Sequence, residues 1–489
     1  MATGAGTGAY ARRLHRATGV RRDMGEIVEA SSPLGAWLER PNDSVRYLVY
    51  CRAFAAASAI HLLLPDALQE GWLVPDLLYW VGAILLAATG CLAGWVLCAA
   101  GVAWPVLFLG DQLTQSIYLL LCALSAIACF AGRRDGRAER TAVGLPYAVR
   151  WLTVLVYALA AVHKVNAGFL DPEVSCATGG VDILARNWGA PWIAADPMKA
   201  WWPIGWLVVE GAIAVLLVVR PAVAIALACF VHVPLTIVFA PAFAFVTASG
   251  FVAALSETDL LWVGRVMRRR WTAIVAIGAA LGIGSFLLYL RNHWVVYGFW
   301  SFKEGILWLG GVWLVAAHLR RPPGSLSWFS AFRERPVGTP RAIGIAVVLI
   351  LVAWGLTPYT GLQFHHTGAM LSNLRIDRGC WNSLVFPEAM RIVEPYVRID
   401  HARIGAGRPD LEAHLEEGLW SPEALLTLRE DSCAHLPRPV RIEGTWHGRR
   451  FDSADLCNAR RWPFGRTVLP RYRAFQHNLR RECPQACIH

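Results

Sequence analysis

Lysine is scarce in this chain. Only Lys164, Lys199 and Lys303 occur, among 46 lysine and arginine residues in 489. Charged residues make up 17% of the sequence, hydrophobic residues make up 56%, and the mean hydropathy is +0.41. This balance excludes an ordinary soluble domain and is typical of a protein that crosses a membrane several times. The sequence also lacks an internal repeat, which argues against a transporter built from duplicated halves.

No nucleic-acid-binding motif accompanies the net charge of +11. The positive residues lie mostly in short loops and near the start, where orientation signals and headgroup contacts are found. We therefore expect a lipid bilayer, and not a nucleic acid, as the partner of this charge. No cleavable signal peptide is evident, and residues 1–44 are predicted to form a flexible, Arg-rich cytoplasmic arm.

Apolar runs of about 17–25 residues recur along the chain and predict membrane-spanning helices. The predicted spans are 45–64, 77–100, 147–166, 203–219, 222–240, 242–256, 272–290, 295–317 and 342–357. The run 101–131 is longer than one span and is interrupted at Pro105 and Asp111, so we expect a re-entrant segment or tight hairpin there. The predicted fold is an all-α polytopic membrane bundle of about nine spans plus this re-entrant segment.

Arginine clusters indicate the orientation. They lie in the N-terminal arm and at Arg133/Arg134/Arg137/Arg140, Arg220, Arg265/Arg268/Arg269/Arg270, Arg320/Arg321 and Arg333/Arg335/Arg341. The positive-inside rule places all of them in the cytoplasm if 101–131 returns to the side from which it entered. The run 147–166 then leads outward to an outer loop, 167–202. We expect a multi-pass membrane protein with a cytoplasmic N-terminus, a transmembrane domain over 45–357 and an extracytoplasmic domain over 358–489.

Twelve cysteines divide into two sets under this topology. The external set is Cys176, Cys380, Cys433, Cys457, Cys483 and Cys487. The other set, Cys51, Cys91, Cys98, Cys122, Cys129 and Cys229, falls in spans or in the run 101–131. An even external set predicts disulfides formed in an oxidising compartment, with the pairing left open. A metal site is the weaker alternative, and no metal is expected, because no His/Cys pair lies at zinc-type spacing.

The C-terminal region reads as a small α+β domain. MRIVEPYVRID predicts a strand pair or one long strand. SPEALLTLRED predicts a helix with Ser421 as its N-cap and Pro422 at its first position. PVRIEGTWHGRRFD predicts a hairpin that turns at His447-Gly448.

Several ionisable groups lie within the predicted spans, and Lys164 is the most informative of them. It lies near the outer end of VLVYALAAVHKVNAG, where such a group is costly and indicates a functional site by default. A desolvated lysine amine can act as a base, whereas a guanidinium stays charged. The alternative is that Lys164 extends its amine to the headgroups. For Glu210 and His232 taken singly, a structural interhelical hydrogen bond is favoured, but the clustering indicates an internal polar pocket.

Three stretches carry a family resemblance. VYALAAVHKVNAGFLDPE places a tyrosine, small residues, a lysine, an apolar residue and an asparagine at the end of a helix. CFVHVPLTIVFAPAFAFVTASGF carries His232 after Glu210 and Arg220-Pro221, and TPYTGLQFHHTGAMLSNLRIDRGCWNSLVFP leads into the external domain. In order and placement these stretches resemble the vitamin K-dependent gamma-carboxylase family and its bacterial relatives with the horizontally transferred transmembrane domain. The resemblance covers roughly residues 45–400.

The resemblance implies a chemistry and a set of roles. Lys164 would be the base toward reduced vitamin K or menaquinol, with O2 and CO2 as co-substrates and a glutamate side chain as the carboxylated group. His163 stands beside it, where the family often has a second lysine. His232, Glu210, Arg375 and Asn373 would serve the lipid quinone, with Asn373 replacing a family histidine. An exported peptide or protein would be the substrate.

Two other functional classes remain open from the sequence. A non-catalytic membrane factor that binds or matures an exported peptide or toxin would keep the fold and lose the chemistry. A channel or transporter would use the buried charges as a permeation path, against which the missing repeats argue. If Lys164 is a base, arginine cannot replace it, whereas an anchoring lysine tolerates that change.

Overall fold

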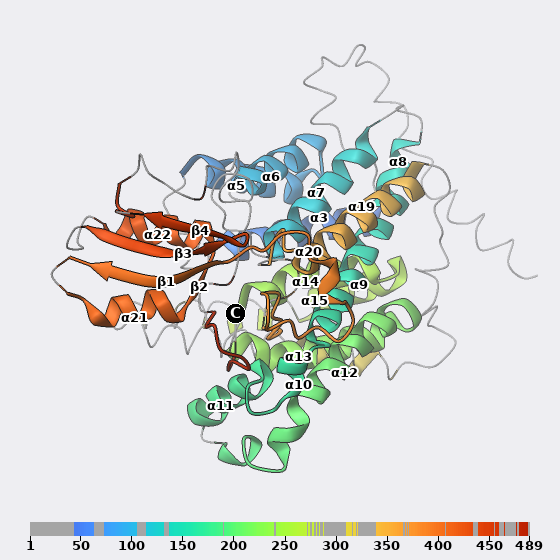
Figure 1. The fold of residues 1–489 in the computed structure, drawn as a ribbon. Coiled ribbons are helices and arrows are strands. Elements are labelled where there is room, and N and C mark those ends of the chain that lie inside the picture. The colour runs from blue at the N-terminus through green and yellow to red at the C-terminus, as the bar shows by residue number, and fades with distance from the viewer. Residues whose placement is uncertain are drawn as a thin grey trace, which may run out of the picture.

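Helices make up most of the chain, and a small antiparallel sheet follows near the C-terminus (Figure 1). This computed structural model describes residues 44–62, 73–104, 114–131, 136–188, 190–238, 241–270, 339–364 and, with interruptions, 367–487, together with scattered residues between 272 and 320. The predicted N-terminal arm lies almost wholly outside the described residues. The predicted spans 272–290 and 295–317 lie largely outside them as well.

The apolar runs form helices. These are α3 (Val45–Leu62), α5 (Leu73–Ala88), α6 (Leu92–Trp104), α7 (Thr114–Phe130), α9 (Leu145–Lys164), α12 (Met198–Val219), α13 (Pro221–Val238), α14 (Pro241–Ala254) and α19 (Thr339–Gly355). Two helical stretches are long and apolar enough to cross a membrane by length and composition, Arg137–Lys164 and Met198–Val219. The first combines α8 (Arg137–Glu139), the π-helix η2 (Arg140–Gly144) and α9. The structure thus supports a helical fold. Two stretches meet the length and composition of a span, and the remaining spans of the expected nine stay a prediction.

The predicted single span 77–100 is wrong, because the chain turns within it. Helix α5 ends at Ala88 and α6 begins at Leu92, with Gly90 between them at a φ of 66°. The two helices pack closely where they carry glycines: a Cβ on Gly82 would lie 2.7 Å from the backbone nitrogen of Cys98. A Cβ on Gly101 would lie 2.8 Å from the carbonyl oxygen of Pro75. The sequences of α5 and α6 are both apolar, so hydropathy alone does not reveal the glycine turn between them.

The run 101–131, predicted to be re-entrant, contains the end of one helix and the whole of another. Its first residues complete α6, and Thr114–Phe130 forms the single helix α7, while residues 105–113 lie outside the described part of the chain. Helices α5, α6 and α7 therefore stand where one span and one re-entrant segment were expected. The expected arrangement crosses the membrane once in this region, through the span 77–100. If α5, α6 and α7 each cross, the chain crosses three times. Both numbers are odd, so α9 would run in the same direction in either arrangement.

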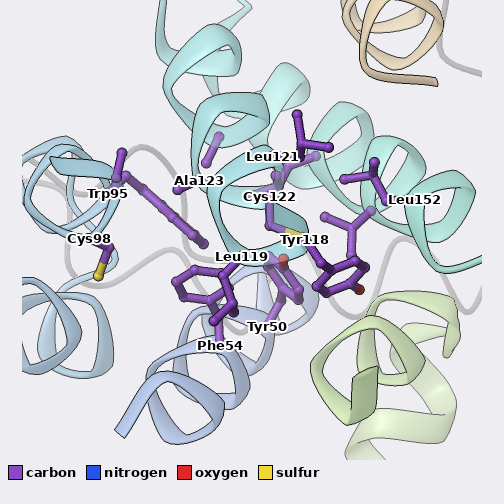
Figure 2. Close-up of a cluster of buried hydrophobic side chains, with 14 of the residues drawn as sticks. Tyr50, Phe54, Trp95, Cys98, Tyr118, Leu119, Leu121, Cys122, Ala123 and Leu152 are labelled. Carbon is purple, nitrogen blue, oxygen red and sulfur yellow. The ribbon is translucent and has the colours of Figure 1, made fainter. Parts of the chain in front are cut away.

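The largest buried cluster joins the first helices to α9 (Figure 2). Phe54 of α3 lies 4.7 Å, between ring centroids, from Trp95 of α6. Tyr118 of α7 hydrogen-bonds Thr153 of α9 at 2.8 Å between the two hydroxyl oxygens. Figure 2 shows Leu152 reaching the same cluster from α9. Helix α9 is therefore held on this side by a packed apolar core.

The sheet has the order β2-β1-β3-β4 and lies at one side of the helices (Figure 1). Its strands are β1 (Val397–Ile404), β2 (Leu419–Trp420), β3 (Val440–Trp446) and β4 (Arg449–Ser453), and it packs with α21 (Pro409–Glu417) and α22 (Pro422–Ser432). The predicted hairpin is confirmed, because β3 pairs with β4 around His447-Gly448. The predicted helix start is confirmed as well, because the Ser421 hydroxyl accepts a hydrogen bond from the Ala424 amide at 3.0 Å.

MRIVEPYVRID is a strand only in its second half. The amides of Ile392 and Val393 donate to the Thr360 carbonyl at 3.0 and 3.1 Å. Thr360 ends α20 (Thr357–Thr360), the short helix that follows α19. The first half of the segment is thus fastened to the helices, and the strand begins after Pro395, which lacks an amide donor.

All six cysteines predicted to be external form disulfides, Cys176–Cys487, Cys380–Cys483 and Cys433–Cys457. The other six, Cys51, Cys91, Cys98, Cys122, Cys129 and Cys229, are free and buried. The first disulfide ties α11 (Cys176–Trp188), which follows α9, to the end of the chain. The loop after α9 and the C-terminal domain therefore lie on the same side of the helices, as the predicted topology requires.

Candidate functional site

Helix α9 presents Lys164 to α12. Ala161, three residues before Lys164, faces Gly211, where an added Cβ would lie 4.0 Å from the alanine Cβ. Residues three apart lie on the same face of a helix, so the packing of α9 on α12 brings Lys164 near the residue beside Gly211. That residue is Glu210, and the structure brings the two predicted site residues together.

The ammonium nitrogen of Lys164 lies 2.8 Å from Oε2 and 3.1 Å from Oε1 of Glu210. The two side chains are only 5% and 11% exposed. The indole Nε1 of Trp206, one turn earlier on α12, donates to Oε1 of Glu210 at 3.2 Å. The Lys164 nitrogen also lies 5.7 Å from the centroid of the Phe169 ring. A buried ion pair between two helices is thus flanked by two aromatic side chains.

Asn166 lies two residues after the end of α9 and joins the helix to the C-terminal domain. Its side-chain Nδ2 donates to the carbonyls of His163 and Ser372, both at 2.7 Å. Its Oδ1 accepts from the amide of Phe169 at 2.8 Å and so caps α10 (Ala167–Leu170). One buried amide therefore fixes both the last turn of α9 and the ring beside the lysine.

Gly168 lets the backbone after α9 lie close to Asn382 at this junction. A Cβ there would lie 2.9 Å from Nδ2 of Asn382, which donates to Oδ1 of Asn166 at 3.2 Å. The amide of Ala167 donates to the Asn382 carbonyl at 3.0 Å. The segment after α9 and the start of the C-terminal domain are therefore one packed unit around the end of the helix.

His163 contacts a different set of residues from Lys164. Its Nδ1 lies 2.9 Å from the Tyr359 hydroxyl, and its Nε2 lies 3.2 Å from the carbonyl oxygen of Thr367. The His163 and Tyr359 rings are stacked with their centroids 5.4 Å apart. These contacts fasten α9 to the segment after α19.

His232 lies deeper in the bundle. Its Nε2 is 2.6 Å from the hydroxyl of Tyr157, which stacks on Phe251 of α14 at 6.2 Å between centroids. Tyr157 precedes Lys164 by seven residues, which is about 10 Å along a helix axis. His232 therefore belongs to a second polar contact on the α9 face that also carries Lys164, about two turns further from the helix end.

Arg375 and Asn373 lie in the C-terminal domain, away from the Lys164 pair. Arg375 is buried and binds Asp377 through two contacts of 2.7 and 2.8 Å, and it also donates to the Arg480 carbonyl at 2.8 Å. Asn373 accepts from the Cys176 amide at 2.6 Å and donates to the Val174 carbonyl at 2.8 Å. Both residues organise the junction between the segment after α9 and the C-terminal part of the chain.

Three residues at the site had not been singled out from the sequence. Trp206 could have been found, because it precedes Glu210 by four residues and so shares its helix face. Tyr359 and Asn382 carried no signal, because their contacts with His163 and Asn166 join segments roughly 200 residues apart.

Comparison of the chain with protein-family models, with curated proteins and with solved structures gave no match. Within the described residues, no group of three or more His, Cys, Asp or Glu side chains could hold a metal ion. The interpretation of the site therefore rests on the buried Lys164–Glu210 pair and its surroundings.

Proposed function

We propose that this protein is an integral membrane enzyme of the vitamin K-dependent gamma-carboxylase type. It couples oxidation of a lipid quinol to carboxylation of a glutamate-type substrate, with Lys164 as the base. The observation that carries the proposal is the contact of 2.8 Å between the buried Lys164 amine and the Glu210 carboxylate. An ionisable pair enclosed by apolar helices is costly unless it serves a purpose.

Exposed apolar side chains support the placement in a membrane. On α12, which carries Glu210, Val208 is 60% exposed and Val215 is 62% exposed. Leu77 and Ile84 on α5 and Leu349 on α19 are exposed to a similar extent. Helices in water rarely present such surfaces, whereas helices in lipid do. The two long apolar stretches and the disulfides on one side of the helices agree with an outer position for Lys164.

The residues around Lys164 fit a lipid quinol in their chemistry. Phe169 and Trp206 offer aromatic surface for a quinone ring, and Lys164 and Glu210 offer groups that exchange protons with a ring hydroxyl. The bound quinol supplies the reaction with oxygen that generates a strong base. This chain's residues would orient the ring, exclude water and take its first proton.

Glu210 would first take a proton from the Lys164 ammonium. The amine lies within hydrogen-bond distance of both carboxylate oxygens, at 2.8 and 3.1 Å. A proton that passes along this contact converts the ion pair into a neutral amine and a protonated carboxyl, and the amine can then take the first proton of the quinol within the buried site. Trp206 holds Oε1 in place and so keeps the carboxylate aligned.

The direct test is quinol oxidation by the protein purified in mild detergent. Reduced vitamin K or menaquinol is supplied with oxygen and bicarbonate, and the epoxide is followed by chromatography. We expect the wild-type protein to form epoxide and Lys164→Ala to lose at least about 100-fold of the rate. The Lys199→Ala variant is the matched control, because Lys199 pairs with Glu173 on the exposed surface. Absence of epoxide from the wild-type protein would contradict the proposal.

A second candidate function is a non-catalytic membrane factor for an exported peptide or toxin. The observation that favours it is that Glu210 engages Lys164 through both oxygens, as a structural ion pair would. In this case the pair fixes α9 against α12 and no proton moves. Arginine would then serve in place of Lys164, and neither quinol nor quinone would bind.

A further inference from the structure

A cleft of about 620 Å³ lies in the C-terminal region, between the sheet and the segments that precede it. One wall is the segment 391–394, which is fastened to the end of α20 through the Thr360 carbonyl. The sheet also lines the cleft, with Arg398 of β1 and Thr445 of β3. Gly448, in the turn between β3 and β4, is a further lining residue.

Arginine dominates the charge of this cleft. Its charged lining residues are Arg378, Arg391, Arg398 and Arg481, together with Asp377 and Glu394. Asp377 is already neutralised by two contacts with buried Arg375 behind the wall. The remaining carboxylate, Glu394, lies 2.7 Å from a guanidinium nitrogen of Arg391. The lining therefore presents four guanidinium groups and one carboxylate that is not paired from behind. Three of these arginines also have acidic partners outside the lining, because Arg391 pairs with Glu388 and both Arg398 and Arg481 lie near Asp400.

The arginines can bind an anion while keeping their protein contacts. Arg398 engages Asp400 through Nε at 3.2 Å, and the Arg398 side chain is 59% exposed. A guanidinium has five N–H donors in a planar fork that matches phosphate and carboxylate oxygens. Arg378 is exposed and lines the same cleft. These two residues can therefore reach an occupant from two different segments of the chain.

The cleft lies close to the end of the last described apolar helix. Helix α19 ends at Gly355, and α20 follows at Thr357–Thr360. Ile392, in the cleft wall, is 77% exposed, and Leu362, just after α20, is 38% exposed. If α19 crosses the membrane, the guanidinium groups lie at the level of the outer headgroups, with apolar side chains beside them.

We propose that this cleft binds the phosphate headgroup of an anionic lipid in the outer leaflet. Arg378 and Arg398 contact the phosphate, and Ile392 and Leu362 lie against the acyl chains. The inference rests on the proposed membrane placement and is independent of the chemistry at Lys164. The exposed apolar residues beside the charges favour a lipid over a soluble acidic peptide.

Native mass spectrometry of the full-length protein in detergent tests this proposal with added phosphatidylglycerol or phosphatidylcholine. We expect the wild-type protein to bind phosphatidylglycerol in preference to phosphatidylcholine. The double variant Arg378→Gln/Arg398→Gln should bind phosphatidylglycerol about tenfold more weakly. Arg408→Gln is the matched control, because Arg408 is an exposed arginine of the same domain that pairs with Asp410 outside the cleft. The Lys164→Ala variant should bind the lipid as the wild-type protein does.

Three results would overturn the proposal. One is equal phosphatidylglycerol binding by the wild-type protein and the double variant with the three disulfides intact. Another is equal binding of the two lipids by the wild-type protein. The third is displacement of the lipid by inorganic phosphate or a soluble acidic peptide at concentrations below that of the lipid, which would assign the cleft to a free anion or a peptide.

Discussion

Lys164 is both buried and paired, as a buried lysine usually is. Its nitrogen is enclosed between two helices and has a carboxylate partner at 2.8 Å. The sequence argument treated burial as the feature that lets the amine lose its proton and act as a base. The structure adds Glu210 as a partner that can hold the proton, so the two residues act as one unit.

The first prediction concerns the stability of this unit. The Glu210→Leu variant leaves the amine buried without its carboxylate and should lower the free energy of unfolding by about 3–5 kcal/mol. The double variant Lys164→Met/Glu210→Leu should regain most of this loss, because no charge is left in the apolar interior. Thermal denaturation in detergent measures both changes. The Lys164→Met variant supplies the second single change. If the stability losses of Lys164→Met and Glu210→Leu simply add in the double variant, the ion pair does not act as a unit.

The second prediction concerns Glu394 in the arginine cleft. Burial raises the pKa of this carboxyl from 4.5 to about 7, although Arg391 beside it acts in the opposite direction. Asp377 and Arg378 also act on it, and His447 lines the same cleft. Because the pKa is raised, the folded protein takes up a proton as the pH falls through about 7.

Protonation of Glu394 removes the negative charge that competes with a bound anion. Binding of phosphatidylglycerol should therefore strengthen about fivefold between pH 8 and pH 6. The Glu394→Gln variant should bind at pH 8 as the wild-type protein does at pH 6. Lipid binding measured across this range checks the effect. A Glu394→Gln variant that keeps the full pH dependence would assign the titration to another group, with His447 the first candidate.

At the scale of elements, the end of α9 depends on Asn166. This side chain holds the last turn of the helix, caps α10 and binds the Ser372 carbonyl. The Asn166→Ala variant should cost about 2–4 kcal/mol, because it removes a cap and leaves two buried carbonyls without donors. Hydrogen exchange should show the Phe169 amide opening faster while the sheet is unchanged. Equal exchange in both proteins would show that the cap does not fix the ring beside Lys164.

The elements show how far the sequence argument could go. The apolar runs, the hairpin at His447-Gly448 and the Ser421 cap follow local rules of hydropathy and turn chemistry, and the structure has them. The turn at Gly90 was missed, because an unbroken apolar composition surrounds it. At the site, Lys164 and Glu210 were both found by their rarity in apolar helices. Their direct contact depends on how α9 packs against α12, which one sequence does not reveal.

At the scale of the whole molecule, the disulfides indicate which segments lie on the same side of the helices. Cys176 follows α9 and Cys487 is close to the end of the chain, so their bond places two distant segments on one side. The free cysteines are buried among the helices. This partition agrees with an oxidising outer side and an Arg-rich cytoplasmic side.

Labelling from outside the cell tests this orientation. Single cysteines are introduced by Ala138→Cys, between α7 and α9, and by Arg408→Cys, in the C-terminal domain, both at exposed positions. We expect an impermeant thiol reagent to label the second variant and to spare the first until the membrane is opened. The native free cysteines are buried and should give a low background. Labelling of Ala138→Cys in intact cells would reverse the topology and place Lys164 at the inner face.

The measurement that tests the central claim most directly compares lysine with arginine at position 164. Arginine keeps the positive charge and can pair with Glu210, but it cannot act as a base near neutral pH. The account predicts that Lys164→Arg folds with its three disulfides, melts within a few degrees of the wild-type protein and forms no quinone epoxide. Epoxide formation by Lys164→Arg at the wild-type rate would contradict the account and leave Lys164 as an anchor between α9 and α12.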